Sequence, residues 1–156
     1  MLKKIKASFS RPSGGRFAIV ASTYNSRYVD GMLRAAGKCL RGAKAETIKT
    51  VRVPGAFEIP VVVARLARTH SPPLDAIICL GVILRGKTTH AQHIAEAVTG
   101  ALMQLQLQHE IPIIHEVLLF ENKDQAAVRC LGKDHNRGAE AAQTALEMAR
   151  VMRELR

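Results

Sequence analysis

Short apolar runs alternate with helical patterns along almost the whole chain, and this alternation constrains the fold most. Apolar, β-rich runs lie at residues 17–21, 47–53, 75–84 and 112–120, and apolar residues at helical spacing lie at 26–41, 58–69, 89–109, 123–131 and 138–155. Strands that alternate with helices build parallel sheets covered on both faces. With right-handed crossovers, the order predicts an α/β protein, a flavodoxin-like three-layer αβα sandwich around a four-stranded parallel sheet.

The length of the chain fits one domain, and its positive charge is concentrated at the N-terminus. Its 156 residues are enough for one domain with one real core. The net charge is +10, and the first 16 residues supply +5 of it without a single acid. We therefore predict a basic N-terminal arm at residues 1–15 and a single domain at 16–156.

Composition excludes several classes of protein. No window approaches 18 uninterrupted apolar residues, which excludes a membrane-spanning helix. The basic N-terminus lacks the apolar run of a secretory signal, so a cytoplasmic location is expected. Three widely spaced cysteines form neither a disulfide framework nor a CxxC metal site.

Ligands of such sheets bind beyond the carboxyl ends of the strands, which directs attention to the loops there. In the first loop, Tyr24 could stack on a planar heterocycle or simply cover the next helix. In the second, the Gly55 and Ala56 amides could bind an oxygen-rich ligand and Glu58 could receive hydroxyls. The alternative is that this turn only caps a helix, with Glu58 as a favourable acid in its first turn.

The third loop, residues 85–90, carries the strongest signal for a phosphate site. Arg85, Lys87 and Thr88 precede a helix start, so cations, hydroxyls and helix amides converge there, although the GxxxxGK[ST] spacing is absent. His90 lies in the first helical turn and is a candidate proton-transfer residue. It forms an HxxH pair with His93, but no third ligand is near in sequence, so no metal is expected.

A fourth segment near the end of the chain holds further cations. Arg129 and Arg137 could bind phosphate, and Glu140 could orient a histidine. A solvated connection between two helices explains the same residues equally well.

Three segments carry a resemblance to a known family. Residues 53–60, residues 80–90 with their Arg-Gly-x-Thr-x-His core, and residues 136–142 with 146–148 resemble the 6,7-dimethyl-8-ribityllumazine synthases, which perform the penultimate step of riboflavin biosynthesis. The likeness covers about residues 16–155. It implies a transferase that condenses 5-amino-6-(D-ribitylamino)uracil with 3,4-dihydroxy-2-butanone 4-phosphate, releasing phosphate and water, without metal or organic cofactor.

The resemblance also implies a role for each matching position. The catalytic residues would be His90 for proton transfer and Glu140 to orient it. The pyrimidine and its ribityl chain would be bound by Tyr24, Ala56, Phe57, Glu58, Val82, Ile83, Leu84 and His115. The phosphate would be bound by Lys87, Thr88, Arg129 and Arg137.

Some of these positions depart from the family pattern. Tyr24 stands where Phe or Trp is usual, and His115 replaces a Phe. Glu116 replaces a common Gly, and Arg137 stands where the family usually has Lys. The groups implied in proton transfer and phosphate binding are retained, so the resemblance implies the same reaction.

Assembly is a further implication. The helix at 89–109 has apolar and small residues over more of its surface than one sheet face can cover, which favours burial against another subunit. The resemblance implies pentamers, with His115 and Arg129 supplied across the interface. The short connection at 132–136 is that of members forming 60-subunit shells, and riboflavin synthase is a candidate partner.

Two other functions stay open from the sequence. One is a flavin- or lumazine-binding protein on the same scaffold without turnover, against which the retained His90, Arg129 and Thr88 argue. The other is RNA binding through the basic arm, although no RNP-like aromatic motif supports an interaction with nucleic acid.

Overall fold

The computed structural model describes residues 12–156, and its elements follow the predicted order. Residues 1–11 of the predicted basic arm lie outside the described part. The elements are β1 (Arg16–Ser22), α1 (Ser26–Gly42), β2 (Thr47–Val53), η1 (Ala56–Glu58), α2 (Ile59–Thr69), β3 (Ala76–Leu84), α3 (His90–His109), β4 (Ile113–Phe120), α4 (Lys123–Cys130) and α5 (Arg137–Glu154). The short 3₁₀ turn η1 is the one element that the sequence pattern did not separate from the helix after it.

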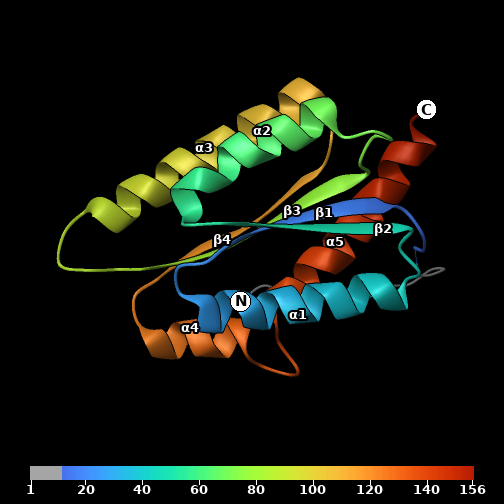
Figure 1. Cartoon of the computed structure of the whole chain (residues 1–156). Coiled ribbons are helices and arrows are strands. Elements are labelled where there is room, and N and C mark those ends of the chain that lie inside the picture. Colours follow the sequence, from blue (N-terminus) through green and yellow to red (C-terminus); the bar gives the residue numbers. More distant parts are fainter. Residues whose placement is uncertain (1–11) are drawn as a thin grey trace.

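The four strands form a single parallel sheet in the order β2-β1-β3-β4. Helices α2 and α3 cover one face, and α1, α4 and α5 cover the other (Figure 1). This arrangement confirms the predicted three-layer α/β sandwich.

Alternation along the strands explains the two cores. Phe17, Ile19 and Ala21 pack against α1 and α5, whereas Ala18 and Val20 pack against α2 and α3. Successive side chains of a strand point to opposite faces, so a central strand with helices on both sides must be apolar throughout. No helix within residues 12–156 is long and apolar enough to cross a membrane.

The strands do not all end at the same level. Pairing between β1 and β3 stops at Ala21 and Leu80, whereas pairing between β3 and β4 continues to Leu84 and Phe120. The last part of β3, from Gly81 to Leu84, therefore extends beyond β1 and has no strand partner on that side. This open stretch of backbone lies at the carboxyl edge of the sheet, where ligands of parallel sheets bind.

Candidate active site

The loops after β1, β2 and β3 are tied together at the carboxyl edge of the sheet. The Tyr24 amide donates to the carbonyl of Pro54 at 2.9 Å, which joins the first two loops. Asn25 has a left-handed backbone (φ 58°), and its side-chain amide donates to the carbonyl of Val82 at 2.7 Å, which joins the first loop to β3. These cross-links fix the loops relative to one another before any ligand arrives.

Tyr24 lies over the second loop with its ring open to solvent. Its side chain is 68% exposed, and a Cβ on Gly55 would lie only 2.9 Å from the ring. The ring therefore lies against a glycine and is largely open to solvent. A large aromatic ring held in this way can stack on a planar ligand.

The three residues predicted to bind a polyol form η1. Within it, Glu58 accepts a hydrogen bond from the Gly55 amide at 2.9 Å through Oε2. One carboxylate oxygen thus stabilises the turn, as the capping alternative expected, and further acceptor sites remain for a ligand. Phe57 is 63% exposed and Ala56 is partly buried.

The end of β3 offers main-chain groups next to Tyr24. Val82 and Ile83 have buried side chains, and Leu84 pairs with Phe120 of β4. On the β1 side of this stretch, the Val82 carbonyl accepts the Asn25 amide. Strand β1 pairs with none of these three residues, so their main-chain groups on that side are not used by the sheet.

Beyond β3, the phosphate candidates lie exposed at the start of α3. The His90 amide donates to the Thr88 hydroxyl at 3.3 Å, and Lys87 is exposed in the same loop. Arg85 pairs with Glu121 at 2.9 Å, so its charge is partly matched. Helix α3 is 20 residues long, and its first amides and dipole favour an anion at this end.

His115 lies in the middle of β4 and is held as a neutral imidazole. Its Nδ1 accepts the Val117 amide at 3.1 Å, so the proton is on Nε2, which donates to the Thr99 hydroxyl of α3 at 2.7 Å. Burial lowers the pKa of His115, which agrees with this neutral form.

The adjacent residue of β4, Glu116, faces the opposite side of the sheet and pairs with α5. Its two oxygens accept Nε and Nη2 of Arg137 at 2.9 and 3.1 Å, and Nη1 of Arg137 donates to Glu140 at 3.0 Å. Burial raises the pKa of Glu116 to about 7; Arg137 opposes this shift and Glu140 adds to it. The sequence-based assignment omitted Glu116, although an acid within an apolar strand was a visible signal.

These contacts bear on two sequence-based roles. Arg137 was expected to bind phosphate, but two carboxylates already surround its guanidinium. Glu140 was expected to orient His90, but α3 and α5 lie on opposite faces of the sheet, and no hydrogen bond joins the two side chains within residues 12–156. Within one chain the structure does not bring them together.

Arg129 differs from Arg137 in its surroundings. It is exposed in the last turn of α4, and within the described part of the chain it forms no ion pair. Asn136, which caps α5, donates to the carbonyl of Cys130 at 2.8 Å and so links the end of α4 to the start of α5. Arg129 and Arg137 therefore lie at neighbouring helix ends.

Apart from His115 on β4, the candidate residues thus form two groups. One group lies on the loops after β1, β2 and β3 and at the start of α3. The other, comprising Arg129, Arg137 and Glu140, lies on α4 and α5 across the sheet (Figure 1). In the described part of the chain, no three His, Cys, Asp or Glu side chains cluster as metal ligands do.

Comparison with known proteins identifies the family. The sequence model described as 6,7-dimethyl-8-ribityllumazine synthase matches residues 14–153. A protein of that name from Mycobacterium avium is 42% identical over 146 residues, which are 92% of this chain and 89% of the relative. Those from Stenotrophomonas maltophilia strain R551-3 and Xanthomonas euvesicatoria are 39% and 40% identical, over 92% and 91% of this chain and 93% and 92% of the relatives. The chain belongs to the 6,7-dimethyl-8-ribityllumazine synthase family of enzymes.

Proposed function

We propose that this chain is a lumazine synthase of riboflavin biosynthesis. It would condense 5-amino-6-(D-ribitylamino)uracil with 3,4-dihydroxy-2-butanone 4-phosphate and release the lumazine, phosphate and water, with no cofactor. The observation that carries the proposal is the end of β3, where Val82, Ile83 and Leu84 have no pairing with β1, beside the exposed ring of Tyr24. A pyrimidine needs both features, a surface to stack on and donors and acceptors along its edge.

The turn next to the ring supports the same assignment. Ala56, Phe57 and Glu58 form η1 directly after the loop that carries Gly55, against which Tyr24 rests. A ribityl chain extending from the pyrimidine would meet the Glu58 carboxylate, whose remaining lone pairs accept hydroxyl protons.

The phosphate of the second substrate would lie at the start of α3. Lys87 and Thr88 supply a cation and a hydroxyl there, and the helix amides add donors. Arg129 would complete the site because its guanidinium is exposed and has no carboxylate partner within residues 12–156. A bidentate guanidinium suits a phosphate dianion.

His90 would transfer protons during the condensation. A primary amine that attacks a ketone loses two protons as the oxygen leaves as water, and elimination of phosphate removes a proton from the neighbouring carbon. A positioned imidazole can both accept and donate these protons. His90 adjoins the Thr88 hydroxyl at the phosphate end, where elimination would occur.

The site would be completed by a second subunit. No hydrogen bond joins Tyr24 or His90 to His115, Arg129, Arg137 or Glu140 within residues 12–156, and a neighbour would supply these four residues. The assembly would be a pentamer or a 60-subunit shell of pentamers in the cytoplasm, with riboflavin synthase as a candidate partner.

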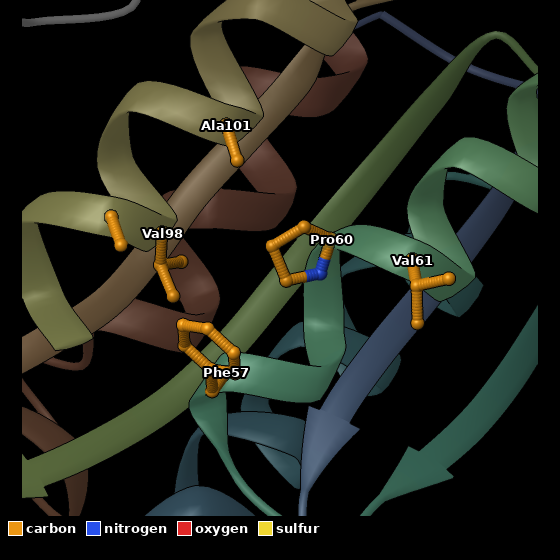
Figure 2. Close-up of a pocket in the computed structure, with 6 residues that line it drawn as sticks. Phe57, Pro60, Val61, Val98 and Ala101 are labelled. Atoms are coloured by element: carbon orange, nitrogen blue, oxygen red, sulfur yellow. The ribbon is translucent and has the colours of Figure 1, made fainter.

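An apolar groove on the surface of the chain could form part of the contact with such a neighbour. Phe57 and Pro60 face Val98 and Ala101 of α3 across it (Figure 2), Val61 also lines it, and its lining is mainly apolar. Phe57 and Val61 are 63% and 70% exposed and line the same groove, and contiguous exposed apolar surface is typical of interaction sites. A subunit interface would cover this surface.

Incubation with both substrates tests the activity. Lumazine absorbance and fluorescence should appear together with one equivalent of inorganic phosphate, and neither should appear when one substrate is omitted. Binding of lumazine or flavin without turnover would favour the non-catalytic alternative. A salt-dependent RNA complex lost on removal of residues 1–16 would favour nucleic-acid binding.

Light scattering at physiological salt tests the assembly. A monomer mass would refute the shared site, whereas the mass of five chains would exclude only the shell. The basic arms would repel one another most strongly at low salt, so the measurement should be repeated over a range of ionic strength.

A further inference from the structure

Glu116 and Arg137 form an ion pair that joins the middle of β4 to the first residue of α5. Glu116 is only 7% exposed, and its two oxygens accept Nε and Nη2 of Arg137 at 2.9 and 3.1 Å. Such a bidentate contact fixes the plane of the guanidinium, which a lysine ammonium in the same place could not match.

Two carboxylates, those of Glu116 and Glu140, balance the positive charge of Arg137. Its Nη1 also donates to Glu140 at 3.0 Å, so two carboxylates face one guanidinium. When both are ionised, the three side chains carry a formal charge of −1, which repels a phosphate dianion. Three of the five N–H donors of Arg137 are occupied, and two remain on a side chain that is 27% exposed.

The neighbouring arginine provides the contrast. Arg129 ends α4 beside the cap of α5, is exposed and has no carboxylate partner in the described part of the chain. The guanidinium of Arg129 therefore keeps its positive charge, whereas that of Arg137 offers donors whose charge is outweighed by two carboxylates. The two are therefore suited to different parts of a substrate.

We propose that Glu116 is a positioning residue that holds Arg137 and cancels its charge, so that Arg137 donates to a neutral, oxygen-bearing part of the substrate and leaves the phosphate to Arg129. This inference rests on the proposed function, because it assumes that both arginines face a substrate at a subunit boundary. It replaces the phosphate-binding role that the sequence predicts for Arg137.

Three variants separate the two roles of Glu116. Glu116→Gln removes the charge and keeps the shape, and Glu116→Asp keeps the charge but shortens the side chain. Glu147→Gln is the matched control, because Glu147 also pairs with an arginine, Arg150, on the exposed face of α5, the helix that carries Arg137. The KM of each substrate and the inhibition constant of inorganic phosphate are measured at pH 8 in a phosphate-free buffer.

Glu116→Gln should raise the KM of the pyrimidine about tenfold, the size of one weakened charge-assisted hydrogen bond. It should leave the KM of the butanone phosphate within about twofold. Inorganic phosphate should inhibit it several times more strongly, because loss of the Glu116 charge raises the formal charge of the three side chains from −1 to 0 and removes the repulsion of the anion. Glu116→Asp should raise the pyrimidine KM but keep the phosphate inhibition of the parent, and Glu147→Gln should change nothing.

The pH dependence of the pyrimidine KM is a further measurement, and a purely structural role of Glu116 would not change it. The pKa of Glu116 is raised to about 7, chiefly by burial. Arg137 and Glu140 are the charged groups of α5 that face it, and on α4 the pKa of the Cys130 thiol is raised to about 11, so this thiol does not titrate near pH 7. The pyrimidine KM of the parent should rise below pH 7, and this rise should be absent in Glu116→Gln.

The outcomes distinguish this inference from the proposed function. A parent protein that makes no lumazine refutes the function itself. An active parent, with a folded Glu116→Gln variant whose pyrimidine KM and phosphate inhibition match the parent, refutes only the role of Glu116. If Glu116→Gln does not fold, Glu116→Asp decides, because an unchanged pyrimidine KM in that variant refutes the positioning role.

Discussion

The packing of α1 against α5 depends on a single glycine, and Gly138→Ala tests this dependence. Gly138 is the second residue of α5, and a Cβ built there would lie 2.0 Å from the carbonyl oxygen of Met32 and 2.5 Å from its Cα. Ordinary contacts with a Cβ are 3.4 Å or longer. The obstructing atoms belong to the backbone of α1, so no side-chain rotation can relieve the overlap, and the helices must separate by about 1 Å or more.

The expected loss of stability follows from this geometry. Overpacking a core typically costs about 1–3 kcal/mol, and a backbone obstruction belongs at the upper end. Met32, Ala141 and Ala142 near this contact are fully buried, so a shift of α5 would weaken the apolar packing around them. A loss of about 3 kcal/mol lowers the Tm of a chain of this size by roughly 6–12 °C.

Thermal and urea unfolding of the parent and the variant measure this loss, at one protein concentration because assembly adds to stability. Gly100→Ala is the control. Gly100 lies within α3, and a Cβ there meets nothing within 4 Å. That variant should gain about 0.5–1 kcal/mol from the better helix propensity of alanine. If Gly138→Ala unfolds at the same temperature as Gly100→Ala, the packing argument is wrong.

Three further predictions concern the site. His90→Ala should lower kcat by about 10²–10⁴-fold with little effect on pyrimidine binding, measured by steady-state turnover and equilibrium titration; parental turnover would contradict the proton-transfer role. Arg129→Ala should raise the KM of the butanone phosphate about 10–100-fold and the KM of the pyrimidine far less, and equal effects on both would contradict the phosphate role. The pKa of Glu116 is about 7 in the folded chain against 4.5 for an ordinary glutamate, so its stabilising contribution is full below pH 4.5 and is lost as the pH rises to about 7. Urea unfolding should therefore show the stability of Glu116→Gln rising relative to the parent across that window, and a constant difference would refute the shift.

Most of the fold could be predicted from the sequence because each element has a clear period. The buried strands β1 and β3 are apolar on both faces, and α1 has its buried residues on one face. η1 was missed because three residues are too few to show a period, and only its hydrogen bonds set it apart from α2. Strand order was not predicted either, since it depends on contacts between segments far apart in the chain.

The site was predictable where its chemistry is local. Tyr24, residues 56–58 and residues 85–90 each lie in one short loop at a strand end, and the general rule for parallel sheets is enough to select them. Glu116 and Arg137 are 21 residues apart, and no spacing rule predicts that a β4 acid meets the start of α5. The two carboxylate partners of Arg137, on which the role proposed for it depends, are therefore visible only in the structure.

The separation of the two residue groups follows from the architecture itself. His90 begins a helix on one face of the sheet, and Glu140 lies in the first turn of a helix on the other. The sheet lies between these two helices, and within residues 12–156 no hydrogen bond joins the side chains of His90 and Glu140. If Glu140 orients a histidine as proposed, we expect that histidine to belong to another subunit. We likewise expect Arg129 to reach the phosphate at the start of α3 in a neighbouring subunit. Catalysis by this chain would then require assembly, and dilution to monomers should abolish turnover even though every residue of the site is still present.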